Sequence, residues 1–175
     1  MRSKVQSLRR PPVAHKGILM TITPHLLAGA AIASATTQSL PVAFLLGFLS
    51  HFILDILPHL DPGTFFNIKE DENQPWPLWI YIFAFSEFIV IWFLVIVLFK
   101  NRGDFGIILM GGLGAIVVDI FDNNPFRFMR KWPIIKQLHW IHGKFHYELN
   151  PKVWYWGLPS ELIIIGGSLW YLLRF

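Results

Sequence analysis

His51 and Asp55 are two ionisable residues inside the apolar segment 47–57. On a helix, a spacing of four places both side chains on one face, with Gly47 one turn earlier on the same stripe. An imidazole and a carboxylate are costly to bury in hydrocarbon, so their presence there predicts a function. A divalent metal ion binds neutral imidazole and ionised carboxylate together. We therefore interpret His51 and Asp55 as metal ligands; a hydrogen-bonded pair that locks two helices is the alternative.

Three further histidines, His139, His142 and His146, have spacings of three and four residues. This spacing places them on one face of a helix that begins near Pro133. Such a cluster indicates metal or phosphate contact. The alternative is an interfacial amphipathic helix with aromatic side chains among the lipid headgroups. Two lysines of the same segment are candidates for binding a substrate phosphate: Lys136 and Lys144.

Other ionisable residues lie near the ends of apolar segments. Asp119 is a candidate general base, and Asp122, three residues later, a possible partner of a metal ligand. Carboxylates near a helix C-terminus oppose the helix dipole and favour a nearby cation. His25, at the start of an apolar segment, is a candidate metal ligand. The turn after Pro58 holds two residues that we expect to support the ligands: His59 and Asp61.

Two glutamates lie inside apolar segments, and they are expected to differ in role. Glu161 is a second candidate catalytic base. Glu87, in the middle of its segment, is expected to be protonated or hydrogen-bonded to a neighbouring helix.

The composition assigns the chain to the lipid bilayer. Of its 175 residues, 54% are hydrophobic and only 15% charged, and the mean hydropathy is +0.47. The absence of cysteine excludes thiolate metal sites. The basic residues lie at segment ends and form no aromatic-basic module, so no specific nucleic-acid binding is expected. No nucleophile elbow, P-loop or dinucleotide-binding fingerprint is present.

The apolar segments predict an all-α, polytopic membrane helical bundle with about five transmembrane helices. We expect these over 18–37, 40–57, 78–99, 105–121 and 154–173. Lysines and arginines concentrate before the first segment and between the fourth and fifth segments, which predicts an N-terminus on the cytoplasmic side. We expect the membrane to be the inner (cytoplasmic) membrane of the cell. Residues 1–17 then form a basic cytoplasmic tail, and 18–175 a single membrane-embedded domain with a cytoplasmic histidine-containing segment at 122–153. In this topology almost every candidate ligand lies at the cytoplasmic face.

The first third of the chain resembles a known family. Thr23-Pro24-His25, followed by Leu-Leu-Ala-Gly29, and Gly47-Phe-Leu-Ser-His51-Phe-Ile-Leu-Asp55 resemble motifs of the YdjM-like membrane-bound metal-dependent hydrolases (the DUF457 group and its relatives). The family's Pro-Asp-x-Asp-His and His-Arg-Gly-x-Thr-His-Ser motifs are not present as such. We take Asp119 with Asp122, and His142 with His146, as their counterparts. The resemblance implies a metal-dependent hydrolase.

The leading hypothesis is therefore a multi-pass inner-membrane hydrolase that binds a divalent metal, zinc, at the cytoplasmic interface. Its substrate would be an ester or phosphoester, and the depth of the site favours a lipid or lipid-linked molecule. Two alternatives stay open: a non-enzymatic membrane scaffold whose polar residues tie helices together, and a small transporter with a relay through Glu87 and Asp119. The sequence leaves the oligomeric state undetermined.

Overall fold

The computed structural model describes residues 21–59, 77–122, 129, 132–146 and 155–175. Within these ranges the chain is all-helical, with six helices and no strands. The helices are α1 (Ile22–Thr36), α2 (Leu40–Asp55), α4 (Leu78–Phe99), α5 (Phe105–Asp122), α6 (Pro133–Phe145) and α7 (Gly157–Arg174). The all-α expectation is confirmed for the described residues: each of the five predicted segments contains a helix, and the histidine-containing segment contains α6. The tail at 1–17 and Asp61 lie outside the described residues.

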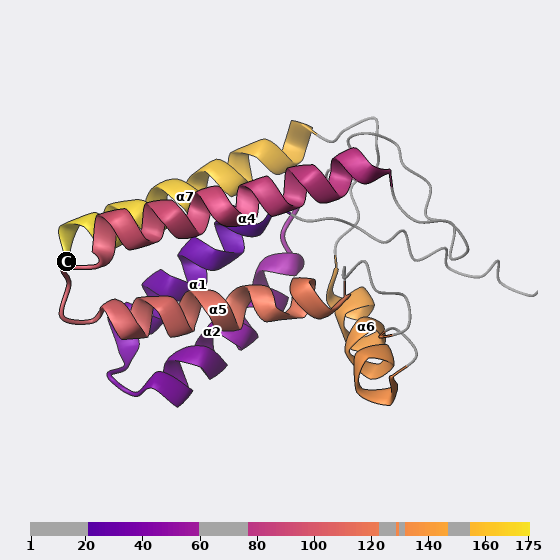
Figure 1. Ribbon diagram of the computed structural model, residues 1–175, viewed down its shortest axis with the longest axis horizontal. Helices are drawn as coiled ribbons and strands as arrows, with labels where there is room; N and C mark the ends of the chain where they lie inside the picture. The colour runs from indigo at the N-terminus through magenta and orange to yellow at the C-terminus, as the bar shows by residue number, and fades with distance from the viewer. Residues whose placement is uncertain (1–20, 60–76, 123–128, 130–131, 147–154) are drawn as a thin grey trace, which may run out of the picture.

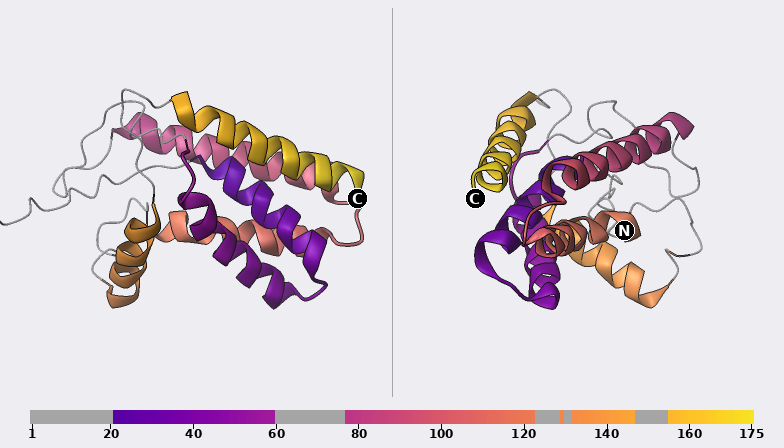
Figure 2. Two further views of the ribbon diagram at one scale, coloured as in Figure 1. Left: turned by 180° about the vertical axis from the view of Figure 1, so that it is seen from behind. Right: turned by 60° about the vertical axis from the view of Figure 1, so that its left-hand side comes forward.

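The most buried element of the bundle is α1. It packs against α2 and α5 on one side and against α7 and α4 on the other (Figures 1 and 2). Leu26, Leu27 and Ala30 are fully buried, and they contact apolar side chains of α4, α5 and α7. Small residues along α1 allow this crowding, because a helix with short side chains can be approached closely from several sides.

A close approach of α2 and α5 depends on glycine. A Cβ atom on Gly47 of α2 would overlap the carbonyl oxygen of Gly111, and one on Gly114 of α5 would overlap that of Phe44. Only residues without a side chain allow the two backbones to lie this near each other. The contact fixes the register of α2 against α5 one turn before His51.

Two helices have the length and composition to cross a membrane, α4 and α5, as judged over the described residues. The outer face of α4 carries apolar side chains that are exposed in the described part of the chain, such as Phe85 and Phe93, which are 66% and 63% exposed. On α7, Leu162 and Ile163 are exposed in the same way. Exposed apolar side chains in such numbers are typical of surfaces that contact a membrane or a partner.

Two carboxylates, one on α4 and one on α7, hold the start of α1. The backbone N–H and the hydroxyl of Thr23 both donate to Oε1 of Glu87 in α4, at 3.0 and 2.9 Å. The hydroxyl of Thr21 donates to Oε1 of Glu161 in α7, at 3.0 Å. Carboxylates at a helix N-terminus satisfy free N–H groups and interact favourably with the helix dipole. The expected hydrogen bonding between Glu87 and a neighbouring helix is therefore present, with Glu87 as the acceptor.

Replacement of Glu87 tests this role. Glu87→Leu leaves the Thr23 N–H and hydroxyl without an acceptor, so we expect it to lower the free energy of unfolding by about 1–3 kcal/mol. Glu87→Gln keeps an oxygen acceptor and is expected to lose less. Thermal unfolding in detergent, followed by circular dichroism, measures both variants. Equal losses would show that the charge of Glu87 matters and its hydrogen bonds do not.

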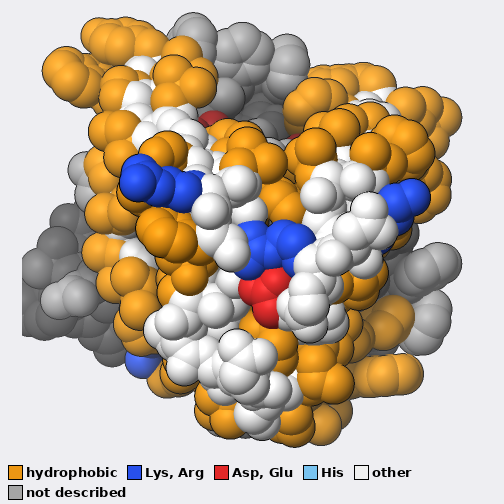
Figure 3. Space-filling model, turned by 90° about the vertical axis from the view of Figure 1, so that its left-hand side faces the viewer, with side chains coloured by type: hydrophobic (Ala, Val, Ile, Leu, Met, Phe, Trp, Pro, Cys, Tyr) orange, Lys and Arg blue, Asp and Glu red, His pale blue; other side chains and the backbone are white. Residues whose placement is uncertain are grey.

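The end of the bundle where α4 joins α5 carries a polar cluster within a largely apolar surface, visible as adjoining blue and red side chains in Figure 3. Arg102 forms an ion pair with Asp104 at 2.7 Å and donates to the carbonyl oxygen of Leu172. Ser34 of α1 donates to Asp104 at 2.5 Å. The cluster therefore joins α1, α7 and the α4–α5 connection.

Helix α6 lies across the opposite end of the bundle (Figure 1). Its inner face buries Ile135 and His142, while Ile134 and Trp140 are exposed. The ring of Phe145 packs edge-on against Phe52 of α2, at 5.6 Å between centroids. Helix α6 thus contacts both α2 and α5, and it brings His142 to the ends of these two helices.

Candidate metal centre

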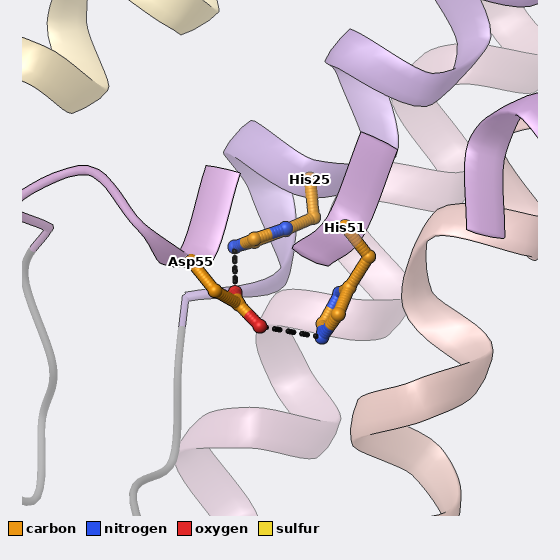
Figure 4. A group of neighbouring side chains, drawn as sticks. All are labelled: His25, His51 and Asp55. Carbon is orange, nitrogen blue, oxygen red and sulfur yellow. Dashed lines mark ion pairs between the residues drawn. The ribbon is translucent and has the colours of Figure 1, made fainter. Parts of the chain in front are cut away.

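His51 and Asp55 face the same buried space at the end of α2, as their spacing predicted. His51 Nε2 lies 3.2 Å from Asp55 Oδ2. From α1, His25 Nε2 lies 3.7 Å from Asp55 Oδ1, and its ring stacks obliquely on that of His51 (Figure 4). His51 and Asp55 are completely buried, and His25 is nearly so. The three side chains thus place a carboxylate between two imidazoles, away from water.

A third imidazole reaches this space from α6. His142 Nε2 lies 3.1 Å from Asp55 Oδ2 and 3.3 Å from His51 Nε2. We refer to His25, His51, Asp55 and His142 as the donor cluster. Three separate parts of the chain supply it, and the predicted convergence of α6 on the polar face of α2 is present.

The other ring nitrogens of the two central histidines are already engaged. Nδ1 of His51 donates to the carbonyl oxygen of Ala115 at 2.7 Å, and Nδ1 of His142 donates to Asp122 Oδ2 at 2.6 Å. Because a carbonyl or carboxylate oxygen can only accept, each Nδ1 carries the proton and each neutral ring presents a lone pair at Nε2. Two nitrogen lone pairs and a carboxylate oxygen therefore point at one another, an arrangement that requires a cation or a proton.

These distances fit a metal ion. Ligands about 2.0–2.1 Å from a tetrahedral zinc ion lie roughly 3.3 Å from one another. The separations among His51 Nε2, His142 Nε2 and Asp55 Oδ2 are 3.1–3.3 Å. A backbone carbonyl or carboxylate that orients the ring through Nδ1 is the usual support of a metal-bound histidine. The buried histidine and aspartate side chains could hold a metal ion, either as His25, His51 and Asp55 or as His51, Asp119 and His142.

Without a metal, a proton on His142 can balance the cluster. Burial by itself lowers the pKa of this imidazole, but the adjoining Asp122 and Asp55 carboxylates outweigh burial and raise the pKa to about 10. A protonated His142 donates toward Asp55 and removes the repulsion among the lone pairs. A metal ion that binds here replaces that proton.

Asp119, Asp122 and His139 surround the donor cluster. Asp122 accepts from His139 Nδ1 through Oδ1, at 2.5 Å, and from His142 through Oδ2. The carboxylate therefore orients one predicted ligand and contacts another, as expected of a supporting residue. Asp119 is buried, with Oδ2 3.9 Å from Nδ1 of His51. His139 is half-exposed and contacts Asp122. It therefore lies beside the donor cluster and is not one of its members.

A second pair of imidazoles lies nearby. His59 Nε2 is 3.2 Å from His146 Nε2, and His59 Nδ1 donates to the carbonyl oxygen of Leu57 at 2.7 Å. His146 follows His142 by one helical turn, with 5.5 Å between the ring centroids. Burial lowers the pKa of His59 and lowers that of His146 to about 3, so both rings are neutral at physiological pH.

The remaining predicted site residues are placed differently. Glu161 accepts a hydrogen bond from Thr21 at the start of α1. Lys136 and Lys144 are exposed on α6, and the ammonium group of Lys144 lies 3.4 Å from the centre of the Trp140 ring. This lysine therefore already has a cation–π partner.

Comparison with protein-family models, with curated proteins and with solved structures finds no match to this chain. The functional argument therefore depends on the geometry of the site. That geometry includes one group that the sequence reasoning did not identify, the carbonyl oxygen of Ala115, which orients His51. The glycines around residues 111–114 were the available signal, because they allow a neighbouring helix to reach the backbone of α5.

Proposed function

We propose that this protein is a multi-pass inner-membrane hydrolase that uses a divalent metal, zinc, held by the donor cluster. The observation that carries the proposal is the set of close contacts among His51 Nε2, His142 Nε2 and Asp55 Oδ2, whose imidazoles are oriented by Ala115 and Asp122. Imidazole and carboxylate are the ligand types of zinc centres, and buried ionisable groups inside a membrane protein favour a functional role.

The membrane assignment is supported by surface and length together. Helices α4 and α5 contain 22 and 18 residues, about 33 and 27 Å, against a hydrocarbon thickness of about 30 Å. The exposed apolar faces of α4 and α7 extend the same environment around the bundle. In the proposed five-span topology, α1, α2 and α7 also cross the membrane, and the lysine and arginine distribution supports a donor cluster at the cytoplasmic side.

The donor set suits hydrolysis. When bound, a divalent metal supplies Lewis acidity, polarising a carbonyl or phosphoryl oxygen and lowering the pKa of water. His25, His51, Asp55 and His142 would hold it, and Asp122 keeps His142 in the tautomer that leaves Nε2 free. The buried position excludes bulk water, which strengthens every electrostatic interaction within the site.

Asp119 is the residue that we assign to proton transfer. It is buried beside His51, whereas Glu161 accepts a hydrogen bond from Thr21 at the α1 terminus. In the reaction, the oxygen of water forms a bond to the carbonyl carbon or to phosphorus, and Asp119 accepts the proton. The bond to the leaving oxygen breaks, and Asp119 returns the proton to that oxygen.

A lipid or lipid-linked substrate fits the setting of α6. Trp132, at the N-cap of α6, and Ile134 and Trp140 on the helix are exposed, and the same helix supplies His142 to the donor cluster. Such side chains reside at the boundary between headgroups and acyl chains. An ester or phosphoester at headgroup depth could therefore approach the site without leaving the bilayer.

The proposal is tested with the full chain in detergent micelles, stripped of metal and reloaded with zinc. We expect zinc-dependent hydrolysis of micellar lipid phosphoesters or carboxyl esters. Asp119→Asn should keep the zinc and lower kcat by about 10²–10⁴-fold, the usual range for loss of a general base. Mass-spectrometric metal counting and product release are the two measurements.

Two results would contradict the proposal. If the zinc-loaded protein cleaves neither class of ester, and its metal contributes only to stability, the donor cluster is structural and the scaffold alternative stands. If the metal-stripped protein keeps full activity, the reaction does not use the donor cluster.

A further inference from the structure

Outside the donor cluster, the strongest unassigned feature is the pair His59 and His146. Their Nε2 atoms approach to 3.2 Å, close to the His51–His142 separation of 3.3 Å. The sequence suggested a supporting role for His59, yet in the structure its ring points at another imidazole. Two facing nitrogens at this separation match two ligands of one ion.

The residues that lead into His59 are held by two hydrogen bonds. The N–H of Leu57 donates to the carbonyl oxygen of Leu54 at 2.9 Å, and Ser160 of α7 donates to the carbonyl oxygen of Pro58. The His59 ring is fixed through Nδ1 by the carbonyl oxygen of Leu57. Leu57 thus has the same role for His59 that Ala115 has for His51: the Nδ1 proton is engaged and Nε2 presents a lone pair.

We propose that His59 and His146 form a second metal subsite adjoining the donor cluster, so that the protein holds two divalent ions. His142 lies on α6, and His146 directly follows the end of this helix. Their ring centroids are 5.5 Å apart, and one ring contacts each site, which places the two subsites side by side. Two-metal centres with ions a few ångströms apart are characteristic of enzymes that cleave phosphoesters. The subsite stands on its own geometry; the choice of phosphoester over carboxyl ester rests on the proposed hydrolase function.

Zinc stoichiometry tests the subsite without measuring activity. The full chain in detergent is stripped with a chelator, loaded with excess zinc, desalted and counted by mass spectrometry. We expect about two zinc ions per chain in the wild type and about one in the His59→Ala/His146→Ala double variant. The second ion should leave first during chelation, since the described residues supply only two imidazoles to it.

His139→Ala is the matched control, because it removes a histidine from the same helix that faces Asp122. It should keep both ions. Loss of one ion in His139→Ala, with two retained in the double variant, would assign the second ion to His139 and overturn the proposal.

Cobalt titration of the wild-type protein provides a measurement that needs no variant. The visible absorption of bound Co²⁺ should rise in two steps; saturation at one equivalent would overturn the proposed second subsite.

The experiments distinguish a failure of the proposed hydrolase function from a failure of the second metal subsite. Two ions without ester cleavage would reject only the enzyme, whereas cleavage with a single bound ion would reject only the second subsite.

Discussion

In the Asp55→Ala variant, we expect zinc affinity to fall by about two to three orders of magnitude. A structural zinc contributes roughly 10–16 kcal/mol at pH 7, so one of four ligands carries about 2.5–4 kcal/mol. Asp55 contacts all three histidines of the donor cluster, and no other carboxylate oxygen among the described contacts lies as close to both His51 Nε2 and His142 Nε2. Competition with a chromogenic chelator measures the dissociation constant.

Thermal unfolding of Asp55→Ala separates the metal site from the scaffold alternative. Zinc at a hundredfold excess over its dissociation constant stabilises the wild type by about 2.7 kcal/mol, and we expect a rise in Tm of several degrees. The variant should show almost no rise. Asp104→Ala is the matched control: it breaks an ion pair at the other end of the bundle, so it should lower Tm but keep the zinc-induced rise. A full zinc-induced rise in Asp55→Ala would reject the assignment.

Gly47→Ala is the second change with a large expected effect. The added methyl group would overlap the carbonyl oxygen of Gly111, so α2 and α5 must move apart. We expect a net loss of about 1–3 kcal/mol in the free energy of unfolding, even though alanine favours a helix by about 1 kcal/mol over glycine. Separation of α2 from α5 should also lengthen the hydrogen bond from His51 Nδ1 to the carbonyl oxygen of Ala115. We expect this change to lower zinc affinity by about 10–100-fold.

Gly166→Ala gives the comparison for this prediction. A Cβ atom on Gly166 of α7 meets no atom within 4 Å, so only the helix preference of alanine remains. This variant should match or exceed the stability of the wild type and bind zinc normally. Chemical unfolding in detergent and the zinc competition assay measure both variants. Equal behaviour of the two variants would show that the α2–α5 contact does not position the site.

Much of the fold was predictable because apolar length and helix-ending residues are local properties. The expected segment 78–99 coincides with α4, and 105–121 with α5 to within one residue. The expected segment 40–57 is longer than α2, which ends at Asp55, shortly before Pro58 disfavours helical backbone. Helices α1 and α2 are short because the chain leaves the helical conformation after Thr36 and after Asp55.

The site was predictable only in part. A spacing of four residues placed His51 and Asp55 on one face, and the orientation of the helices placed His142 at the same end. Sequence spacing does not fix how one helix is rotated against another. Spacing therefore could not show that His59 faces His146. Nor could it show that Glu161 contacts Thr21 at the start of α1, although the sequence suggested a catalytic role for this glutamate.

The donor cluster combines His25, near the start of the described chain, with His142, far along it. During synthesis, α1, α2 and α5 emerge from the ribosome before α6 exists, so the imidazole that completes the cluster arrives last. Asp55 must meanwhile lie beside His25 and His51 in a partly built bundle. Under the proposed metal function, the full donor cluster therefore forms only after translation has passed residue 142, and a nascent chain stalled before α6 would hold only the group of His25, His51 and Asp55.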